Sequence, residues 1–206
     1  MADAGPQLIL ASDSPRRRAI LDRLGLPFEV VPAGLPEEAG AADPASSPAR
    51  VAEALALAKA EAVAADHPAA LVLGADTLVC VGDKRFGKPA DAAEARAMLE
   101  ALAGRTHTVV TGVALVGYAR GLQALAHETT AVTFRRLSAR EVASYVASGE
   151  PADKAGAYAV QGKASLFVER VEGDYDNVVG LPLRTVARLL ETAGVELWPE
   201  LDGEMA

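Results

Sequence analysis

Short apolar runs alternate with helical patterns along most of this chain, and this alternation limits the possible folds more than any other feature. The apolar runs predict strands at residues 7–11, 28–31, 71–75 resuming at 78–81, 106–116, 124–135 and 164–171. The helical patterns predict helices at residues 15–24, 48–65, 92–103, 139–148 and 181–193. Because two long runs flank Gly121, they are expected to form an antiparallel hairpin. The order therefore predicts an α/β fold with a mixed β-sheet flanked by helices.

The first two helices carry explicit start signals. Ser14 and Ser47 each precede a proline, and a serine N-cap followed by proline at the first helical position is a common helix start. Gly25 is placed to end the first helix. The second helix carries Val51, Leu55 and Ala58 on one face, with Lys59 nearby.

Composition excludes several classes of protein. The 206 residues are 50% hydrophobic and 23% charged, as in an ordinary globular protein, and allow one large domain or two small lobes. Because Cys80 is the single cysteine, an internal disulfide framework and a multi-cysteine zinc site are both excluded. The net charge of −8 argues against a broad nucleic-acid footprint. The abundant alanine suggests tight helix packing.

The N-terminal residues lack the basic and apolar regions of a signal peptide. No apolar run approaches the roughly 18 residues of a membrane span. The sequence therefore predicts a cytoplasmic protein that makes no contact with membranes or nucleic-acid polymers.

A local cationic spot stands out against the acidic background. Arg16, Arg17 and Arg18 fall in the first turns of the first helix, where the positive end of the helix dipole disfavours them. A bound anion would reverse that effect, and the Ser12 and Ser14 hydroxyls together with free backbone N–H groups would complete a phosphate site. A solvated basic turn is the alternative.

Further candidates follow along the chain. Asp76 and Thr77 come after an apolar strand, where a carboxylate is unusual unless it is paired, binds metal or takes part in catalysis. An Asp that caps a loop is the alternative. Lys59 and Lys88 are additional cations, each of which alone could be a solvated surface residue. Glu37, in an acidic loop, could help to hold Mg²⁺ through its carboxylate oxygens.

Gln161 stands beside Gly162 and could present an amide, which both donates and accepts, to the edge of a flat ligand. The alternative is that the Gln161 side chain forms a hydrogen bond within a local turn. Neither a Walker A motif, a Rossmann glycine fingerprint nor a Gly-x-Ser-x-Gly elbow is present, and the histidines lack metal-ligand spacing.

Taken in order, these segments resemble the Maf family of nucleoside triphosphate pyrophosphatases. The resemblance covers about residues 7–195, so we expect a single Maf-like domain over 1–206 with an acidic tail at 196–206. It rests on Ser12-x-Ser14-Pro15-Arg16-Arg17, Lys59, Gly74-Ala75-Asp76-Thr77, Gly87-Lys88-Pro89, Asp153-Lys154-Ala155-Gly156-x-Tyr158, Gln161-Gly162 and Gly180-Leu181-Pro182.

The resemblance implies hydrolysis of a nucleoside triphosphate to the monophosphate and pyrophosphate with a divalent cation, Mg²⁺ or Mn²⁺. It also implies a two-lobed fold related to inosine triphosphatase, with the site in the cleft between the lobes. A homodimer is expected by analogy. The stretch from Tyr158 to Gly162 is similar to the branch of the family that prefers dTTP and UTP.

Residue roles are implied in the same way. Asp76 matches the proposed general base and a metal ligand, and Glu37 matches a second metal residue. The positions linked to base specificity are Arg16, Thr77 and Gln161. The phosphate-handling positions are Ser12, Arg17, Lys59 and Lys88, of which the two lysines are expected to act in catalysis. Ser14 is expected to be a further substrate-binding residue.

Two departures from the family pattern are visible. Asp13 stands at a position that is often small, and Pro36 replaces one of two consecutive acidic residues, which weakens the assignment of Glu37. Two alternative functions remain: a pyrophosphatase for 7-methyl-GTP, and a non-catalytic nucleotide-binding regulator of cell division. Asp76 favours an enzyme, because a sensor has no need of a general base.

Overall fold

The computed structural model describes residues 7–35 and 46–198. Its centre is a seven-stranded mixed sheet in the order β2-β1-β3-β5-β6-β7, with β4 paired to β3. The strands are β1 (Leu8–Leu10), β2 (Phe28–Val30), β3 (Leu71–Val81), β4 (Lys84–Phe86), β5 (Thr106–Gly117), β6 (Leu122–Phe134) and β7 (Val168–Glu172). β1 pairs in parallel with β2 and β3, and the remaining pairs are antiparallel. The predicted α/β class with a mixed sheet is confirmed.

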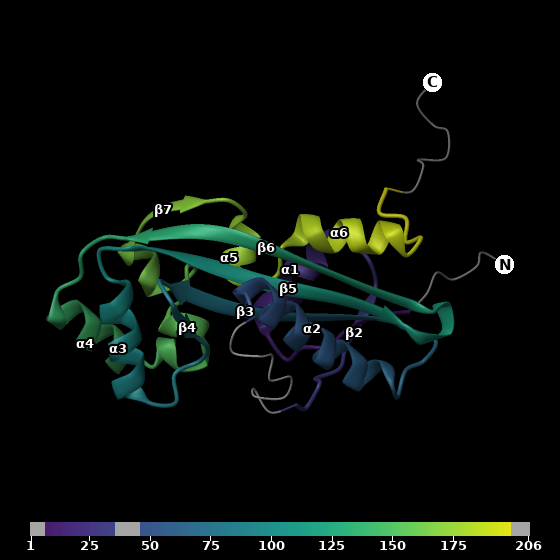
Figure 1. Cartoon of the computed structure of the whole chain (residues 1–206), viewed down its shortest axis with the longest axis horizontal. Coiled ribbons are helices and arrows are strands. Elements are labelled where there is room, and N and C mark those ends of the chain that lie inside the picture. The colour runs from purple at the N-terminus through teal and green to yellow at the C-terminus, as the bar shows by residue number, and fades with distance from the viewer. Residues whose placement is uncertain (1–6, 36–45, 199–206) are drawn as a thin grey trace, which may run out of the picture.

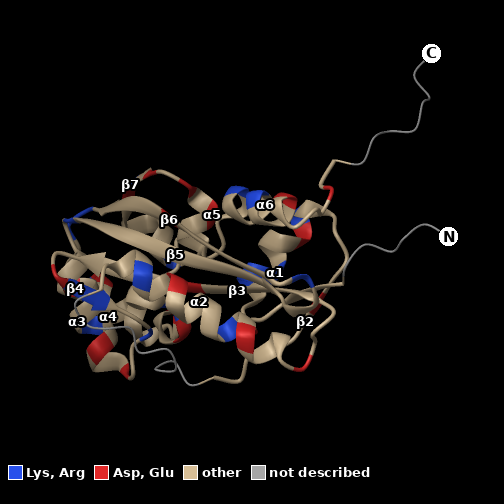
Figure 2. Ribbon diagram, turned by 45° about the vertical axis from the view of Figure 1, so that its right-hand side comes forward, with Lys and Arg blue, Asp and Glu red and all other residues tan. Residues whose placement is uncertain are grey.

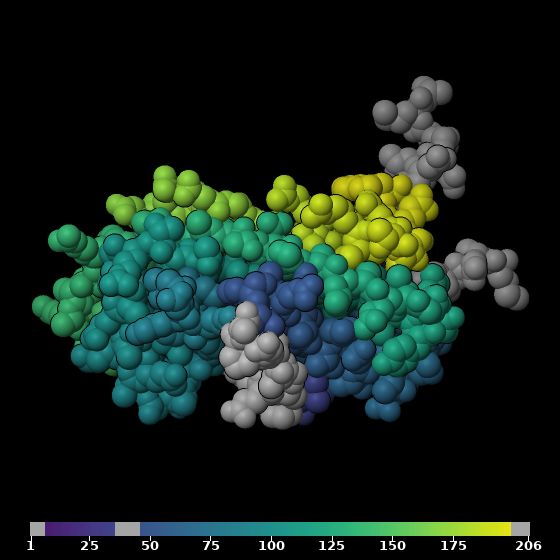
Figure 3. Space-filling view, viewed as in Figure 1, coloured from purple at the N-terminus to yellow at the C-terminus, as the bar shows by residue number. Residues whose placement is uncertain are grey.

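Six α-helices accompany the sheet in the described ranges: α1 (Pro15–Leu21), α2 (Pro48–Ala64), α3 (Ala92–Leu102), α4 (Ala139–Ala147), α5 (Tyr175–Val179) and α6 (Leu183–Thr192). Short 3₁₀ helices cover Asp22–Leu24, Tyr118–Arg120, Glu150–Asp153, Ala155–Ala157 and Lys163–Phe167. β5 and β6 run along the length of the molecule, with α3 and α4 at one end and α2, α6 and β2 toward the other (Figure 1). The space-filling view shows α6, in yellow, packed against this long hairpin (Figure 3).

The predicted helix starts at Ser14 and Ser47 are confirmed, since each serine hydroxyl accepts a hydrogen bond from the backbone three residues on. The strand predicted at 164–171 is wrong in its first half. Lys163–Phe167 forms a 3₁₀ helix, and β7 begins at Val168. In that helix Ala164 and Phe167 are both buried, because residues three apart in a 3₁₀ helix lie on the same side.

The most deeply buried residues of α2 lie beside the apolar face that the sequence shows. Val51, Leu55 and Ala58 are only half-buried, whereas Ala52, Ala56 and Ala60 are fully buried. The reason lies in the sheet, where Gly74 and Gly112 face the helix.

The packing at these two glycines is very close. A Cβ on Gly112 would overlap the carbonyl group of Ala52, and a Cβ on Gly74 would overlap the carbonyl oxygen of Ala56. Glycine inside a strand often marks such a close approach of another backbone. Only the smallest side chains on α2 fit against this surface, which confirms the tight packing that the alanine content suggested.

Side chains of the sheet alternate between two apolar layers. Leu8 and Leu10 join the core that also buries Ile20 of α1, whereas Ile9 and Ala11 join the core beneath α2. The helices that follow β1 and β2 therefore lie on opposite faces of the sheet. In open α/β sheets a ligand crevice lies where the connections diverge in this way, at the carboxyl ends of the strands.

A gap along one edge of β3 marks the same place. On one edge β3 pairs continuously with β5 from Val72 to Cys80. On the other edge it pairs with β1 as far as Leu73 and with β4 only from Val79. Within the described residues, no strand pairs with that edge at 74–78. Side chains from both faces of the sheet can therefore meet at this gap.

Charged residues of both signs are interspersed on the helices at both ends of the molecule (Figure 2). None of the helices in the described part has both the length and the apolar character that crossing a bilayer requires.

The close contact of α2 with the sheet gives a first prediction. Gly112→Ala should lower the free energy of unfolding by about 3 kcal/mol, because the new methyl group must displace the backbone of α2. Urea denaturation followed by circular dichroism measures this change. Gly87→Ala is the control, because a Cβ there meets no atom within 4 Å and should change stability by less than about 0.5 kcal/mol. Equal stability of the two variants would contradict the packing described.

Candidate active site

A cavity of about 640 Å³ opens at the gap in the edge of β3. Its walls come from the carboxyl end of β1, the start of α1, the middle of β3, and the segments around Lys88, Gln161 and Gly180. The predicted site residues that line it are Ser12, Ser14, Arg16, Arg17, Lys59, Asp76, Thr77, Lys88 and Gln161. Glu37 lies outside the described residues.

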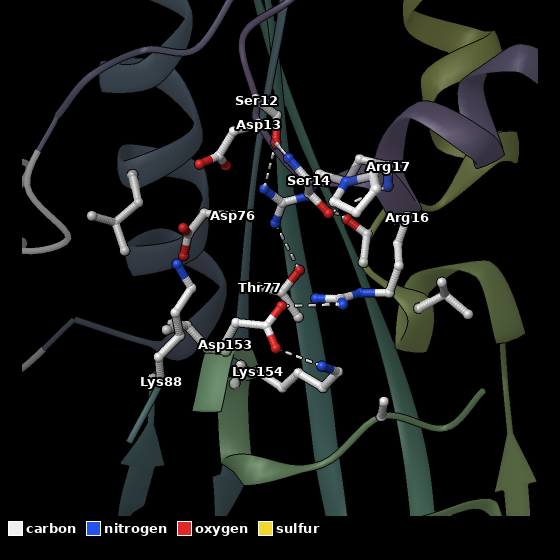
Figure 4. Close-up of a pocket in the computed structure, with 18 of the residues that line it drawn as sticks. Ser12, Asp13, Ser14, Arg16, Arg17, Asp76, Thr77, Lys88, Asp153 and Lys154 are labelled. Carbon is white, nitrogen blue, oxygen red and sulfur yellow. Dashed lines mark hydrogen bonds and ion pairs between the residues drawn. The ribbon is translucent and has the colours of Figure 1, made fainter. Parts of the chain in front are cut away.

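Arg17 is held in place by three bonds from its guanidinium group. Nε donates to the carbonyl oxygen of Gly180 at 2.9 Å, and the terminal nitrogens donate to Ser12 Oγ at 3.4 Å and Thr77 Oγ1 at 3.2 Å (Figure 4). Burial lowers the pKa of Arg17, and the nearby Asp76 charge opposes that shift. Arg17 therefore presents a fixed cation to the cavity.

Thr77 connects Arg17 to a buried layer behind the site. Its hydroxyl lies 2.9 Å from Thr111 Oγ1, and Thr111 donates to the carbonyl oxygen of Asn177 at 3.1 Å. Because the proton of Thr111 is used in that bond, Thr77 is the donor to Thr111. Thr77 thus has no proton left for a ligand and can only accept.

Asp76 projects from the opposite face of β3. Its Oδ1 lies 2.5 Å from Lys59 Nζ on α2, and the two side chains are 16% and 25% exposed. Lys88 also points toward Asp76 (Figure 4). The carboxylate therefore stands between two ammonium groups and remains open to the cavity.

A second ion-pair group lies on the other side of the cavity. Asp153 lies 3.5 Å from Arg16 and 2.5 Å from Lys154 Nζ, and Lys154 also donates to the carbonyl oxygen of Glu150 at 2.8 Å. The hydrogen bond from Lys154 lowers the pKa of Asp153. Sequence reasoning quoted Asp153 and Lys154 in a motif but did not select them as site residues. The signal in the sequence was the pair of adjacent opposite charges, Asp153 and Lys154, shortly before Gly156.

Tyr158 forms part of the cavity wall beside the exposed Gln161. Behind it, the Tyr158 hydroxyl lies 2.8 Å from Nε2 of the buried His107. Burial lowers the pKa of His107 to about 4, so that the imidazole is neutral at neutral pH. The Tyr158 hydroxyl is thus held by the neutral imidazole of His107, which lies behind the cavity wall.

The donor set fits a divalent cation only in combination with a ligand. Within 7–35 and 46–198, no three His, Cys, Asp or Glu side chains come together to hold a metal. The carboxylates of Asp13 and Asp76, however, face the same part of the cavity (Figure 4). Because Mg²⁺ is commonly held by one or two carboxylates and by phosphate oxygens, these residues suit a metal that arrives with a phosphorylated ligand.

The chemical capacity of the cavity follows from these groups. Arg16, Arg17, Lys59 and Lys88 can neutralise several negative charges at once. Asp76 can orient a water molecule or take a proton from it. The arrangement suits hydrolysis of a polyanionic small molecule.

Comparisons with known proteins agree with this picture. A family model described as "Maf-like protein" matches residues 7–193. The dTTP/UTP pyrophosphatase of Moorella thermoacetica is 55% identical over 93% of this chain and 97% of that protein. The proteins of the same name from Symbiobacterium thermophilum and Deinococcus radiodurans are 51% and 50% identical, and each match covers 96% of the relative and 93% or 94% of this chain.

Among solved structures, a HAM1 protein from Coxiella burnetii is 18% identical and superposes with a TM-score of 0.49. The match covers 91% of this chain and 99% of that one. A likeness of this strength carries no conclusion about function.

The buried His107 gives a prediction of pH dependence. Its folded-state pKa of about 4 lies below the ordinary value of 6.5, so the unfolded chain binds a proton first as the pH falls. The contribution of His107 to the free energy of unfolding should be fully present above pH 6.5. Between pH 7.5 and pH 5 this group alone should lower the free energy of unfolding by about 2 kcal/mol. Urea denaturation at the two pH values measures it. His107→Gln, which cannot be protonated, should lose this part of the pH dependence; an unchanged pH profile would contradict the assignment.

Proposed function

We propose that this chain, which belongs to the Maf family, hydrolyses dTTP and UTP to the monophosphate and pyrophosphate. The observation that carries the proposal is the meeting of Asp76 with four cationic side chains in one cavity. The names of the relatives that are 50–55% identical support the same activity and the same substrates.

The triphosphate is assigned to the cationic side of the cavity. Arg17 is fixed by Gly180, Ser12 and Thr77, so little side-chain entropy is lost when it binds a phosphate oxygen. Lys59 approaches Asp76 from the other face of the sheet, and Lys88 also points toward this carboxylate. Charge that develops on the leaving pyrophosphate would be stabilised by these groups.

Asp76 is assigned as the general base. A water molecule attacks the α-phosphorus, and its proton passes to an Asp76 carboxylate oxygen while the bond between the α-phosphorus and the bridging oxygen breaks. The bridging oxygen leaves with the pyrophosphate. Lys59 binds Oδ1 at 2.5 Å and holds the carboxylate in one orientation.

The nucleobase of the substrate is assigned to the side of the cavity formed by Arg16, Thr77 and Gln161. Uracil and thymine present two carbonyl oxygens and one N–H group on their pairing edge, whereas cytosine lacks that N–H group. Since Thr77 can only accept, it suits the N–H group, and the donors on Arg16 and Gln161 suit the carbonyl oxygens. These preferences favour dTTP and UTP over CTP.

A divalent cation, Mg²⁺ or Mn²⁺, is part of the proposal. Asp76 and Asp13 would hold it together with phosphate oxygens. Glu37, which lies outside the described residues, is proposed as a further ligand. When bound, the metal would neutralise phosphate charge as a Lewis acid. The substrate would come from the cytoplasmic nucleotide pool. The homodimer that the family suggests stays a prediction.

Release of pyrophosphate by the purified protein, with Mg²⁺ or Mn²⁺, tests the function. The panel is dTTP, UTP, CTP, 7-methyl-GTP and ITP. We expect turnover of dTTP and UTP above the rest, and Asp76→Asn should lower kcat about 10²- to 10⁴-fold, because the amide still accepts from Lys59 but cannot take a proton.

Asp66→Asn is the matched control, since this exposed carboxylate lies outside the cavity and should leave turnover unchanged. Near-normal turnover by a folded Asp76→Asn variant would refute the general-base role. Preference for 7-methyl-GTP would place the chain in the alternative branch. Tight binding without turnover of any nucleotide would favour the non-catalytic regulator.

A further inference from the structure

A pair of side chains outside the cavity lining holds the segment that carries Gln161. Tyr145 lies on α4, and Glu150 begins the 3₁₀ helix that follows it. The Tyr145 hydroxyl donates to Glu150 Oε1 at 3.0 Å, so the two residues form one unit. Neither residue is among those that line the cavity.

This pair binds the backbone on both sides of Gln161. The Tyr145 hydroxyl accepts from the Ala159 amide at 3.3 Å, and Glu150 Oε2 accepts from the Lys163 amide at 3.1 Å. The two amides lie two residues before and two residues after Gln161. The segment is therefore fixed at both ends while Gln161 itself stays exposed at the cavity.

Gly162 shows how closely the carboxylate sits against this segment. A Cβ at that position would overlap Glu150 Oε1, so a larger residue directly after Gln161 would displace the carboxylate. The Gly162 amide also donates to the Ala159 carbonyl oxygen at 3.0 Å, which closes the turn. The backbone around Gln161 thus has few alternative positions.

The rest of the pair is anchored in rigid surroundings. Tyr145 is 4% exposed and its ring lies edge-on to Phe167, with 5.1 Å between the ring centroids. The Glu150 carbonyl oxygen accepts from Lys154, whose ammonium group also binds Asp153, the partner of Arg16. Glu150 therefore connects the Gln161 segment to the Arg16 side of the same cavity.

We propose that Tyr145 and Glu150 are positioning residues that fix the Gln161 amide for recognition of the pyrimidine edge. The inference rests on the proposed function, in which Gln161 contacts the base. Neither Tyr145 nor Glu150 lines the cavity in which the phosphate-binding groups and Asp76 stand. Its loss should therefore weaken base recognition and leave the chemical step intact.

The test compares Tyr145→Phe and Glu150→Gln with the unchanged protein. Tyr145→Phe removes the hydroxyl and Glu150→Gln replaces the carboxylate by an amide, each at nearly constant side-chain volume. We expect KM for dTTP and UTP to rise about three- to tenfold, from the loss of one or two hydrogen bonds, with kcat within about twofold. The preference for UTP over CTP, measured as the ratio of kcat/KM values, should fall by a similar factor. Amide hydrogen exchange at Ala159 and Lys163 should become about tenfold faster.

Two controls separate positioning from general destabilisation. Ser138→Ala removes the N-cap of α4 and lowers the stability of the same helix, yet it touches nothing in the Gln161 segment, so selectivity should stay unchanged. In a Gln161→Ala background, Tyr145→Phe should cause no further loss of selectivity, because residues that act through one group are not additive.

Unchanged KM and selectivity in both Tyr145→Phe and Glu150→Gln, despite faster amide exchange, would overturn the inference. Turnover of dTTP by the unchanged protein would still uphold the proposed function in that case. An equal loss of selectivity in Ser138→Ala would also overturn it. Absence of pyrophosphate release by the unchanged protein would remove both the function and the inference.

Discussion

The contact of α2 with the sheet sets the position of much of the site. Ala52, Ala56 and Ala60 lie against the sheet at Gly74 and Gly112, at a distance that leaves no space for a Cβ on either glycine. Lys59 stands on the same helix between the second and third of these alanines, so its Nζ reaches Asp76 of β3 at 2.5 Å. A helix held further from the sheet by larger side chains would carry Lys59 away from the carboxylate. Packing and function are therefore linked through one surface.

The gap along the edge of β3 is the second constraint. Asp76 and Thr77 are neighbours in sequence, so their side chains point to opposite faces of the sheet. In a fully paired strand these faces would be separated. Here β1 ends beside Leu73 and β4 begins beside Val79, so that Lys59 of α2 and Arg17 of α1 line one cavity from opposite sides.

The sequence predicted the elements that carry strong local signals. The caps at Ser14 and Ser47 and the long hairpin around Gly121 follow from turn and helix-start chemistry, which acts over a few residues. The ordered motifs also selected nine residues that line one cavity, although their roles remain proposals. The errors involve tertiary contacts. The deeply buried alanines of α2 were not identified, because the glycines that receive them lie in two distant strands. The first half of the 164–171 segment was misassigned because a short apolar run has no period that distinguishes a strand from a 3₁₀ helix. Tyr145 and Glu150 could not be found from the sequence, since their proposed role depends on hydrogen bonds to the backbone of another segment.

The most direct test of the account is a crystal structure with a dTTP analogue whose α–β bridging oxygen is replaced by NH, so that hydrolysis is blocked. The account predicts the α-phosphate at the gap beside residues 74–78, with Asp76 on one side and Arg17 on the other. It also predicts the thymine edge against Gln161, with the Tyr145 and Glu150 bonds to Ala159 and Lys163 retained. A triphosphate bound elsewhere, or a base turned away from Gln161, would contradict it.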